Sequence, residues 1–522
     1  MEAMGFVEAP EVQHLTSNSV DNFASSQQLF NELTKELSSM KAKNMDFTSL
    51  EGLIEKKGRE VLRKLLEEHL RNRGVGNVGP AIVGKDEEHR GYKKVTSKRI
   101  TSIFGKVENE RLMYFRPGIS AIFPKDASLN LPEKTYSHEL TKRVCKETAK
   151  SSFDTTSEAI LGSTGVEVGK RQIEELSVEG AKDFDNFYNH PCTKELLDEV
   201  QKSNLLVMTC DSKGIVMRKE DLKEATKKKA DENVKKLSKR LSKGEKKNCK
   251  RMATVASVYN NDLYHRTPDE VMKRMSNKEK ESHPKPVLKR VWASIEKDQK
   301  EVISDMFEEA VNRDPTQNKD WVCLVDGEPR QLENIEQEAK SRDANVVIIM
   351  DIIHVIEYLW KAARCFFKES SYECEAWVND KTYQVLQGKS KNVARSIRSK
   401  AGKIHLSDEQ EKVIKKSITY LTKKSKYLRY DEYLKRGYPI GTGVIEGACR
   451  HLIKDRMDLT GARWSLNGAE AILKLRSLVS SGDFDEYWAY HELEEYCRNY
   501  DDKIGDTTES RQRGNEKLKL LD

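Results

Sequence analysis

Short apolar runs that end in an aspartate recur along the chain. An apolar run of five or six residues bounded by polar or turn residues is typical of a buried strand. An aspartate at the end of such a strand lies at the edge of a sheet, half in the core and half in solvent, where a cation can be held. The runs 205–210, 321–325 and 346–350 lead directly into Asp211, Asp326 and Asp351.

The segments around these runs complete a predicted sheet. Ser212-Lys213-Gly214 predicts a turn, residues 215–217 a second strand, and residues 252–259 a third. Residues 285–312 have apolar positions at helical spacing, which predicts a long helix before the fourth strand. The order of three strands, a helix, a strand, a helix and a strand predicts an α/β core. We expect an RNase H-like mixed five-stranded sheet with helices on both faces.

The N-terminal region is predicted to be mainly helical. Residues 25–40 and a segment that begins at Asp46 and stops at Gly74 have amphipathic helical patterns. Two roles stay open for these helices: packing on their own domain, or forming an arm for dimerisation or for binding DNA ends. Residues 75–94 have the composition of a linker, and residues 100–115 predict a small β-hairpin.

Three helices in close order are predicted after Ser137, at 139–150, 154–161 and 168–188. A short helix, a glycine-containing turn and a helix with Lys170 and Arg171 in its first turn resemble a helix-turn-helix unit. In such units the second helix lies in the major groove of DNA.

Composition narrows the class of protein. A chain of 522 residues is expected to form several domains. The charged residues make up 34% of the chain, the N-terminus lacks a secretory signal, and no apolar run is long enough for a membrane span, so we expect a cytoplasmic protein with no membrane partner. Nine scattered cysteines without ligand-like spacing indicate reduced thiols and argue against a zinc site. Residues 223–251 hold thirteen Lys or Arg against four acids, which is consistent with contacts to phosphates.

The C-terminal half contains one further acidic motif. Residues 362–435 are basic and predicted to be helical, which indicates a helical insertion. After it, Thr442 can cap a helix on which Glu446, Arg450 and Lys454 follow each other at intervals of four. One acid and two bases on a shared face suit a metal ligand beside a nucleic-acid backbone, although a surface ion pair has the same spacing.

Carboxylates from two adjacent strands and one helix can hold two Mg²⁺ ions roughly 4 Å apart. Carboxylate oxygens suit Mg²⁺, with Mn²⁺ as a plausible substitute, and substrate phosphates complete the shell. Such a site cuts and joins phosphodiester bonds without a nucleophilic side chain.

The motifs together resemble the ISKra-type family of DDE transposases of bacterial insertion sequences, which is related to the Mutator-like transposases. The resemblance covers roughly residues 95 to 490, and it implies an RNase H-like core, a helical insertion and an N-terminal DNA-binding region. It also implies metal-dependent cleavage and strand transfer at terminal inverted repeats of double-stranded DNA, with homo-oligomers in the DNA complex. The matching motifs are Cys210-Asp211-Ser212-Lys213-Gly214, Lys250-Arg251-Met252-Ala253-Thr254-Val255, Leu324-Val325-Asp326-Gly327, Asp351-Ile352-Ile353-His354-Val355-Ile356-Glu357-Tyr358-Leu359-Trp360, Gly443-Val444-Ile445-Glu446-Gly447-Ala448-Cys449-Arg450, Thr460-Gly461-Ala462-Arg463-Trp464 and Ser481-Gly482-Asp483-Phe484-Asp485-Glu486-Tyr487-Trp488.

The resemblance assigns Asp211, Asp326 and Glu446 as the catalytic and metal-binding triad. Asp351 and His354 match a motif that lies between the second acid and the glutamate in related transposases, so they are expected to be auxiliary. A competing assignment makes Asp351 the second metal ligand in place of Asp326. Further DNA contacts are expected from Lys170, Arg171, Arg450, Lys454, Arg463 and Trp464, although a buried role for Trp464 is equally open.

Two other functions remain open for this chain. One is a nuclease of the same fold without end joining, and the other is a domesticated DNA-binding regulator without catalysis.

The predicted organisation has six parts. They are a helical region and linker at 1–94, a hairpin with a helix-turn-helix at 95–200, the first part of the core at 201–361, the helical insertion at 362–435, the core's C-terminal helices at 436–495 and a polar tail at 496–522.

Overall fold

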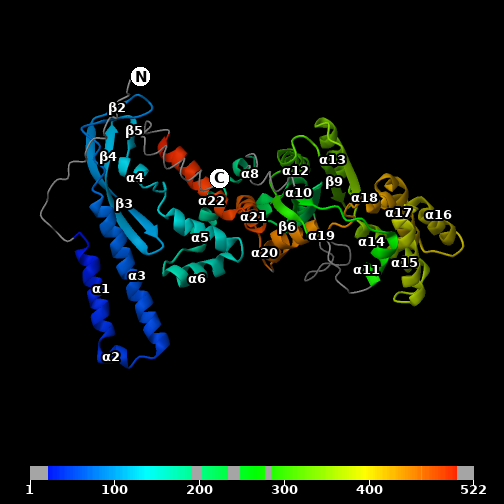
Figure 1. Ribbon diagram of the computed structural model, residues 1–522, viewed down its shortest axis with the longest axis horizontal. Helices are drawn as coiled ribbons and strands as arrows, with labels where there is room; N and C mark the ends of the chain where they lie inside the picture. Colours follow the sequence, from blue (N-terminus) through cyan, green and yellow to red (C-terminus); the bar gives the residue numbers. More distant parts are fainter. Residues whose placement is uncertain (1–21, 190–202, 233–246, 277–283, 460, 502–522) are drawn as a thin grey trace, which may run out of the picture. The chain divides into compact units, whose positions relative to one another are not determined.

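The computed structural model describes residues 22–189, 203–232, 247–276, 284–459 and 461–501 (Figure 1). Contacts between these residues divide them into two compact units. The first unit takes described residues from 1–143, 157–168 and 493–513, and the second takes described residues from 144–156, 169–492 and 514–522. The predicted tail at 496–522 and the basic run at 223–251 lie partly outside the described residues.

The first unit begins with a pair of packed helices, as the sequence predicts. Helix α1 (Ala24–Leu37) packs along α3 (Phe47–Asn72), and the short α2 (Met40–Lys43) connects them. Asp46 caps α3, because its carboxylate accepts the backbone N–H of Ser49 at 2.9 Å. The Glu68 carboxylate of α3 accepts the backbone N–H groups of Ser25 and Ser26 at 3.0 and 3.1 Å, which satisfies donors at the start of α1.

The predicted hairpin is present, but it is longer than expected. An antiparallel sheet contains β3 (Tyr92–Ser102), β4 (Gly105–Arg116) and β5 (Ile119–Ile122), and helix α4 (Pro124–Ser128) follows it. The predicted linker at 75–94 is wrong over its second half, where β1 (Ile82–Val83) pairs with β2 (His89–Arg90) and β3 begins. The sequence pattern did not indicate these strands, because the first half of β3 is largely exposed and consists mainly of charged and polar residues instead of apolar ones.

The three helices after Ser137 are α5 (His138–Thr148), α6 (Phe153–Thr164) and α7 (Lys170–Glu179). The predicted third helix at 168–188 is too long, because α7 stops at Gly180 and a separate α8 (Phe184–Asn189) follows. A side chain at Gly180 would collide with the sulfur of Cys145, so this position accepts only glycine in the close packing it has.

The second unit contains a five-stranded mixed sheet. Its strands are β6 (Leu205–Val216), β7 (Lys250–Asn261), β8 (Val287–Ser294), β9 (Asp320–Val325) and β10 (Val346–Met350), in the spatial order β10-β9-β6-β7-β8. Strands β6, β7 and β8 pair antiparallel, whereas β9 and β10 run parallel to β6. Helices η1 (Lys219–Asp221), α10 (Glu224–Asp231), α11 (Pro268–Ser276), α12 (Gln299–Arg313), α13 (Pro329–Ser341) and α14 (Ile352–Phe366) connect or follow the strands. The expectation of a mixed α/β fold with a five-stranded sheet is confirmed.

One of the five predicted strands is not a separate strand, and one observed strand was not predicted. The turn predicted at Ser212-Lys213-Gly214 does not exist, because β6 runs through these residues and pairs with β7, Ser212 opposite Thr254 and Gly214 opposite Met252. The long helix predicted at 285–312 is also wrong, because its first part is β8 and only its second part is α12. Apolar residues spaced four apart at its start fit helical periodicity, but pairing with β7 decides the conformation. The predicted number of strands is right only because the two errors cancel.

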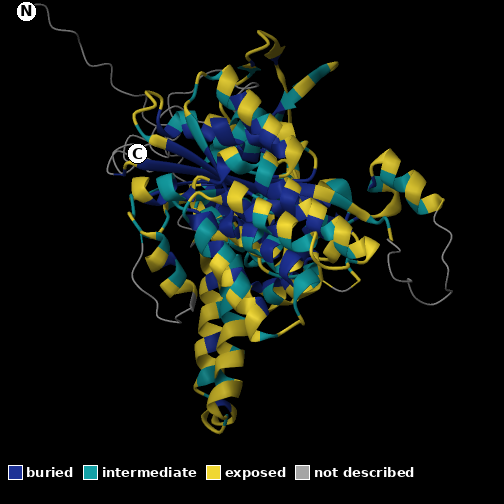
Figure 2. Cartoon of the chain, turned by 90° about the vertical axis from the view of Figure 1, so that its right-hand side faces the viewer, coloured by how far each residue is buried: buried dark blue, intermediate teal, exposed yellow. Residues whose placement is uncertain are grey.

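Helices cover both faces of the sheet. Alternate residues of β7 and β8 point to opposite faces, as in any strand. Ala256, Val258 and Trp292 join the core that contains α12, whereas Val255, Val291 and Ala293 join a second core with α19 (Gly443–Cys449) and α21 (Leu466–Ser481). Figure 2 shows how buried residues (dark blue) gather inside the molecule while the outer helix faces are exposed (yellow).

Residues 362–435 are helical, as predicted. They form the end of α14 and then α15 (Tyr372–Leu386), α16 (Ser390–Ala401), α17 (Asp408–Lys423), η2 (Ser425–Tyr427) and α18 (Tyr430–Arg436). Ser407 and Gln410 form a capping box at the start of α17. The chain then continues through α19, a π-helical turn (Arg450–Lys454), α20 (Asp455–Met457), α21, α22 (Phe484–Tyr496) and a second π-helical turn (Cys497–Asp501).

Among the described helices, none combines the length and the apolar character that a membrane crossing requires. All eight cysteines in the described part of the chain are free thiols, in agreement with the expectation from their spacing.

A buried ion network holds β8 against α12. The Arg313 guanidinium donates to the Glu309 carboxylate at 2.7 Å and to the backbone carbonyl of Leu288 at 2.6 Å. Glu309 also pairs with Arg290 of β8 at 3.0 Å, and Arg290 pairs with Asp483 at 3.1 Å. The side chains of Arg313 and Glu309 are 2% and 5% exposed, so neither charge can be solvated if its partner is lost.

We expect Glu309→Ala to lower the free energy of unfolding by about 3–5 kcal/mol, because it leaves the buried Arg313 charge without its acidic partner. The neighbouring Glu308→Ala removes an exposed carboxylate and is expected to change stability by less than about 0.5 kcal/mol. Urea unfolding followed by circular dichroism measures both. Equal effects of the two substitutions would contradict this role for the network.

Candidate functional site

The candidate site lies where β9 separates from β6. Their last parallel pair is Thr209 with Leu324, and beyond it β6 remains paired only with β7. Asp211 and Asp326 each follow this last pair by two residues, so they lie at the same edge of the sheet. Gln331 of α13 donates to the Cys210 carbonyl oxygen at 2.7 Å and so provides a partner where β9 no longer does.

Asp211 is half-buried and has several partners. Its Oδ1 accepts the backbone N–H of Ser212 at 2.6 Å, and its Oδ2 lies 3.4 Å from Lys213 Nζ. The Cys449 thiol of α19 donates to the same Oδ2 at 3.4 Å. The Asp211 carboxylate raises the pKa of Lys213, and the charge of Asp326 contributes in the same direction. Lys213 therefore supplies the positive charge that offsets Asp211.

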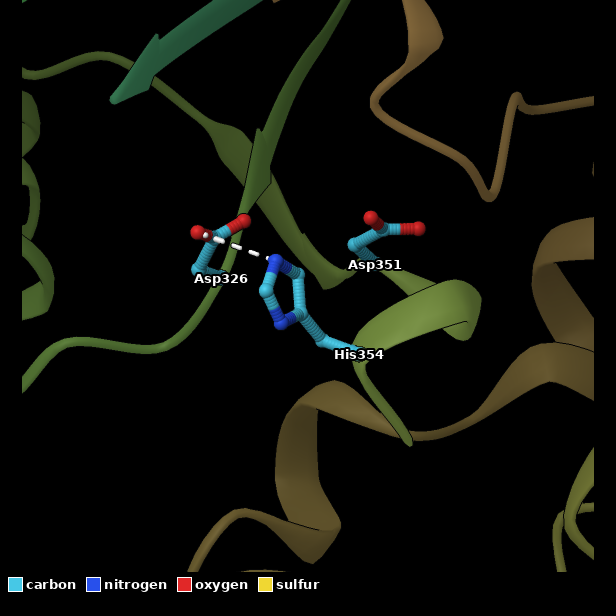
Figure 3. A group of neighbouring side chains, drawn as sticks. All are labelled: Asp326, Asp351 and His354. Carbon is cyan, nitrogen blue, oxygen red and sulfur yellow. Dashed lines mark ion pairs between the residues drawn. The ribbon is translucent and has the colours of Figure 1, made fainter. Parts of the chain in front are cut away.

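Asp326 follows β9 directly and pairs with His354 of α14. The distance between His354 Nε2 and Asp326 Oδ2 is 3.1 Å, and each side chain is about 30% exposed (Figure 3). The hydrogen bond to Asp326 raises the pKa of His354 to about 9, so the imidazole is protonated at neutral pH. Each aspartate at this edge thus has its own protein cation.

Asp351 differs from the other two aspartates because it is fully buried. It caps α14: its Oδ1 accepts the backbone N–H of Ile353 at 3.0 Å. Its Oδ2 accepts the Thr442 hydroxyl at 2.6 Å. Burial raises the pKa of its carboxyl group. These two hydrogen bonds join the start of α14 to the start of α19, where the expected capping bond from Thr442 within its own helix is absent.

One oxygen of Asp326, one of Asp351 and one nitrogen of His354 all lie within 4.8 Å of one another. Carboxylate and imidazole are suitable ligands for several divalent cations. In Figure 3, however, the imidazole points toward Asp326 while the carboxylate of Asp351 points away from both. Both oxygens of Asp351 are already hydrogen-bonded, which favours a positioning role for this residue and leaves Asp326 as the more available ligand.

Glu446 lies on α19 and is exposed. No hydrogen bond or ion pair within the described residues joins its carboxylate to either aspartate. Its position is set through Cys449, which follows it by about one turn on the same side of the helix and contacts Asp211. The structure therefore places Glu446 on the helix that touches the site, with its carboxylate free to accept a ligand.

The expected row of Glu446, Arg450 and Lys454 is not regular, because Arg450–Lys454 form a π-helical turn. A π turn has more residues per turn than an α-helix, so side chains four apart no longer stack in one line. The Arg476 guanidinium donates to the Leu452 carbonyl oxygen at 2.9 Å and supports this irregular segment.

The predicted DNA contacts are in different environments. Lys170 pairs with Asp154, Arg171 pairs with Glu175 at 3.0 Å, and Arg450 pairs with Asp455 at 3.5 Å. Lys454 and Arg463 are exposed and form no ion pair with any described residue. Their contacts with DNA remain predictions.

Trp464 is the one predicted contact that is buried, at 6% exposure. Its indole N–H donates to the Met457 carbonyl oxygen at 3.1 Å, and the Arg456 guanidinium lies 4.9 Å from the centre of its ring. Its backbone N–H also donates to the Val216 carbonyl oxygen at 3.1 Å. These contacts give Trp464 a packing role next to the end of β6.

Lys213 and Gln331 are parts of the site that were not predicted from the sequence. Lys213 follows Asp211 by two residues, so both side chains lie on the same face of a continuous strand. Because a turn was predicted at Ser212-Lys213-Gly214, the shared strand face of Asp211 and Lys213 was not expected. Gln331 had no signal, because its contact with Cys210 joins residues 121 positions apart.

We expect Thr442→Val to lower the free energy of unfolding by about 1–3 kcal/mol, because it leaves the buried Asp351 carboxylate with one unmet hydrogen bond. Thr442→Ser keeps the hydroxyl and should retain most of the stability. Thermal or urea unfolding compares the two variants. A Val variant as stable as the Ser variant would show that the Thr442–Asp351 bond does not support the site.

Comparison with known proteins gives no family assignment. The chain matches no protein-family model, and its sequence matches no curated protein. The function is therefore argued from the residues of the site alone.

Proposed function

We propose that the protein is a DNA transposase of the DDE type, which cleaves and joins DNA strands with divalent metal ions. The observation that carries this proposal is the placement of Asp211 and Asp326, each two residues beyond the last parallel pair of β6 and β9. Two carboxylates at one sheet edge, beside a helix with a free glutamate, are the donor set that two-metal phosphoryl transfer requires.

The topology of the sheet supports an RNase H-like core. Three antiparallel strands are followed by two strands parallel to the first, and helices alternate with the last strands. In this interpretation α15 to α18 form an insertion between the fifth strand's helix and α19, which carries the third acid. The three acids then come from β6, the end of β9 and α19.

The donor set fits Mg²⁺ or Mn²⁺, because hard cations prefer carboxylate oxygens. When bound, the ions would activate a water molecule or a 3′-hydroxyl and stabilise the leaving oxygen. Asp211, Asp326 and Glu446 would hold them. Without metal, Lys213 and His354 offset the charges of Asp211 and Asp326. Once the carboxylates bind metal, either cation can instead pair with a phosphate of the substrate.

Asp351 and Thr442 position the two helices that carry His354 and Glu446. Their hydrogen bond joins the start of α14, which presents His354, to the start of α19, which presents Glu446. The competing assignment of Asp351 as a metal ligand places the ion on a fully buried carboxylate that already accepts hydrogen bonds from Ile353 and Thr442. Asp326 is about 30% exposed and pairs with His354 through Oδ2, so we favour Asp326.

The test is cleavage of a labelled duplex that carries the end of the encoding element, in Mg²⁺ or in EDTA. We expect Asp211→Ala, Asp326→Ala and Glu446→Ala each to reduce the rate of cleavage by about a thousandfold or more, because each removes a metal ligand. Binding of the duplex in EDTA should be unchanged or tighter, since each change removes a negative charge near phosphate.

Asp351→Ala should retain part of the activity, and Asp408→Asn, an exposed acid of α17, should retain all of it. If Asp326→Ala still cuts and Asp351→Ala does not, the second ligand is Asp351. If the wild type binds the duplex but never cuts it in metal, the protein is a DNA-binding regulator. Cleavage without any joined product identifies a nuclease.

A further inference from the structure

Helix α16 has an unusual distribution of charge. The chain as a whole has 85 acids for 92 bases, yet residues 381–407 contain no acid. Six Lys or Arg fall on α16 or immediately beside it. They are Lys389, Lys391, Arg395, Arg398, Lys400 and Lys403.

The cations in the first half of α16 oppose the stability of the helix that carries them, whereas Arg398 and Lys400 lie in the last turn, where the helix dipole favours cations. Lys391 and Arg395 are four residues apart, where like charges destabilise a helix. Lys389 occupies the N-cap and Lys391 the first turn, where the helix dipole favours acids, and α16 has no acid there. The helix is held instead by its inner face, where Val393, Ala394 and Ile397 are buried. Helix stability therefore does not account for Lys389, Lys391 and Arg395.

The cations form a defined face. At 100° per residue, Lys391, Arg395 and Arg398 lie within about 60° of one another on the side of α16 opposite Val393 and Ile397. Asn392 and Ser399 flank them, and all five residues are exposed. We call these five residues the α16 outer face.

The outer-face cations have no acidic partner among the described residues. Several other exposed cations of the second unit do have one: Lys426 pairs with Glu336 at 2.7 Å, Arg364 pairs with Glu369 at 3.4 Å, and Arg429 pairs with Glu432. The α16 outer face thus leaves three neighbouring cations available to an anionic partner, in a stretch of sequence that contains no acid.

We propose that the α16 outer face binds the phosphate backbone of duplex DNA, as a contact surface separate from the aspartates. Lys, Arg, Asn and Ser are side chains that contact phosphates without reading bases. Lys391 to Arg398 span about 10 Å along the helix, and duplex DNA carries one charge per about 1.7 Å of its axis. One groove edge can therefore meet all three cations at once.

The surface belongs to the helical layer rather than to the sheet. Helix α16 packs on α17 and α15, and α17 in turn packs on α14, whose first residues hold His354. DNA bound at α16 would therefore be held at a place different from the carboxylates that would bind the metal ions. The inference rests on the proposed function, because it takes DNA as the ligand. It adds a sequence-independent anchor to that function.

The test uses the full chain and a labelled 30-base-pair duplex of arbitrary sequence, with affinity measured between 50 and 200 mM salt. The variant is Lys391→Gln with Arg395→Gln and Arg398→Gln. Each lost phosphate contact lowers the slope of log affinity against log salt by about 0.9. If three contacts are lost, the ratio of wild-type affinity to variant affinity should be about 40 times larger at 50 mM salt than at 200 mM salt.

The matched control is Arg364→Gln with Lys426→Gln and Arg429→Gln, which removes the same charge from cations that already have acidic partners. It should change the slope by less than about 0.9, the effect of one phosphate contact. Thermal unfolding of the outer-face variant should be unchanged or occur at a higher temperature, because the like charges are gone.

An outer-face variant with the slope of the wild type would overturn the inference, and so would a control variant with an equal loss. If the wild type cuts DNA while the outer-face variant binds as before, only this inference fails. If the wild type binds no duplex, the inference and the proposed function fail together.

Discussion

The end of the parallel pairing between β6 and β9 is the constraint on which the site depends. While the two strands are paired, their backbone groups satisfy each other and the side chains belong to the core. Beyond Thr209 and Leu324 the two strands are no longer paired. Gln331 provides a partner for the Cys210 carbonyl, and two carboxylates become accessible without leaving the sheet. Burial on one side and solvent on the other is the environment in which a carboxylate can hold a cation and still exchange it.

Like charges placed this close require compensation, and the structure supplies it locally. Lys213 offsets Asp211 and a protonated His354 offsets Asp326. The third aspartate, Asp351, is treated differently, because it is buried and compensated by hydrogen bonds from Ile353 and Thr442. The three aspartates therefore have two different roles, and the burial of Asp351 distinguishes it from Asp211 and Asp326.

Electrostatics also distinguishes surfaces of the second unit. Some of its exposed cations, such as Lys426 and Arg429, pair with acids, which limits their attraction to polyanions. The α16 outer face lacks such acids and retains its charge at a cost in helix stability. Salt screens exposed charges within about 10 Å at 0.1 M, so a surface of this kind acts only on a partner in contact with it.

The sequence by itself determined the elements whose signals are local. The strands at 321–325 and 346–350, the capped helix that begins after Asp46 and the helical nature of 362–435 follow from apolar periodicity and turn residues, and the structure has them. The three aspartates that follow apolar runs were also evident from the sequence, because the end of an apolar run is a local feature; that β6 continues past Asp211 was not evident. Tertiary structure decided what local pattern leaves open: pairing with β7 made β6 continuous and turned 287–294 into a strand, although their own periodicity indicated otherwise. It also decided which aspartate is buried and which cation each acid meets, because hydrogen bonds such as Thr442–Asp351 join residues 91 positions apart that no local pattern relates.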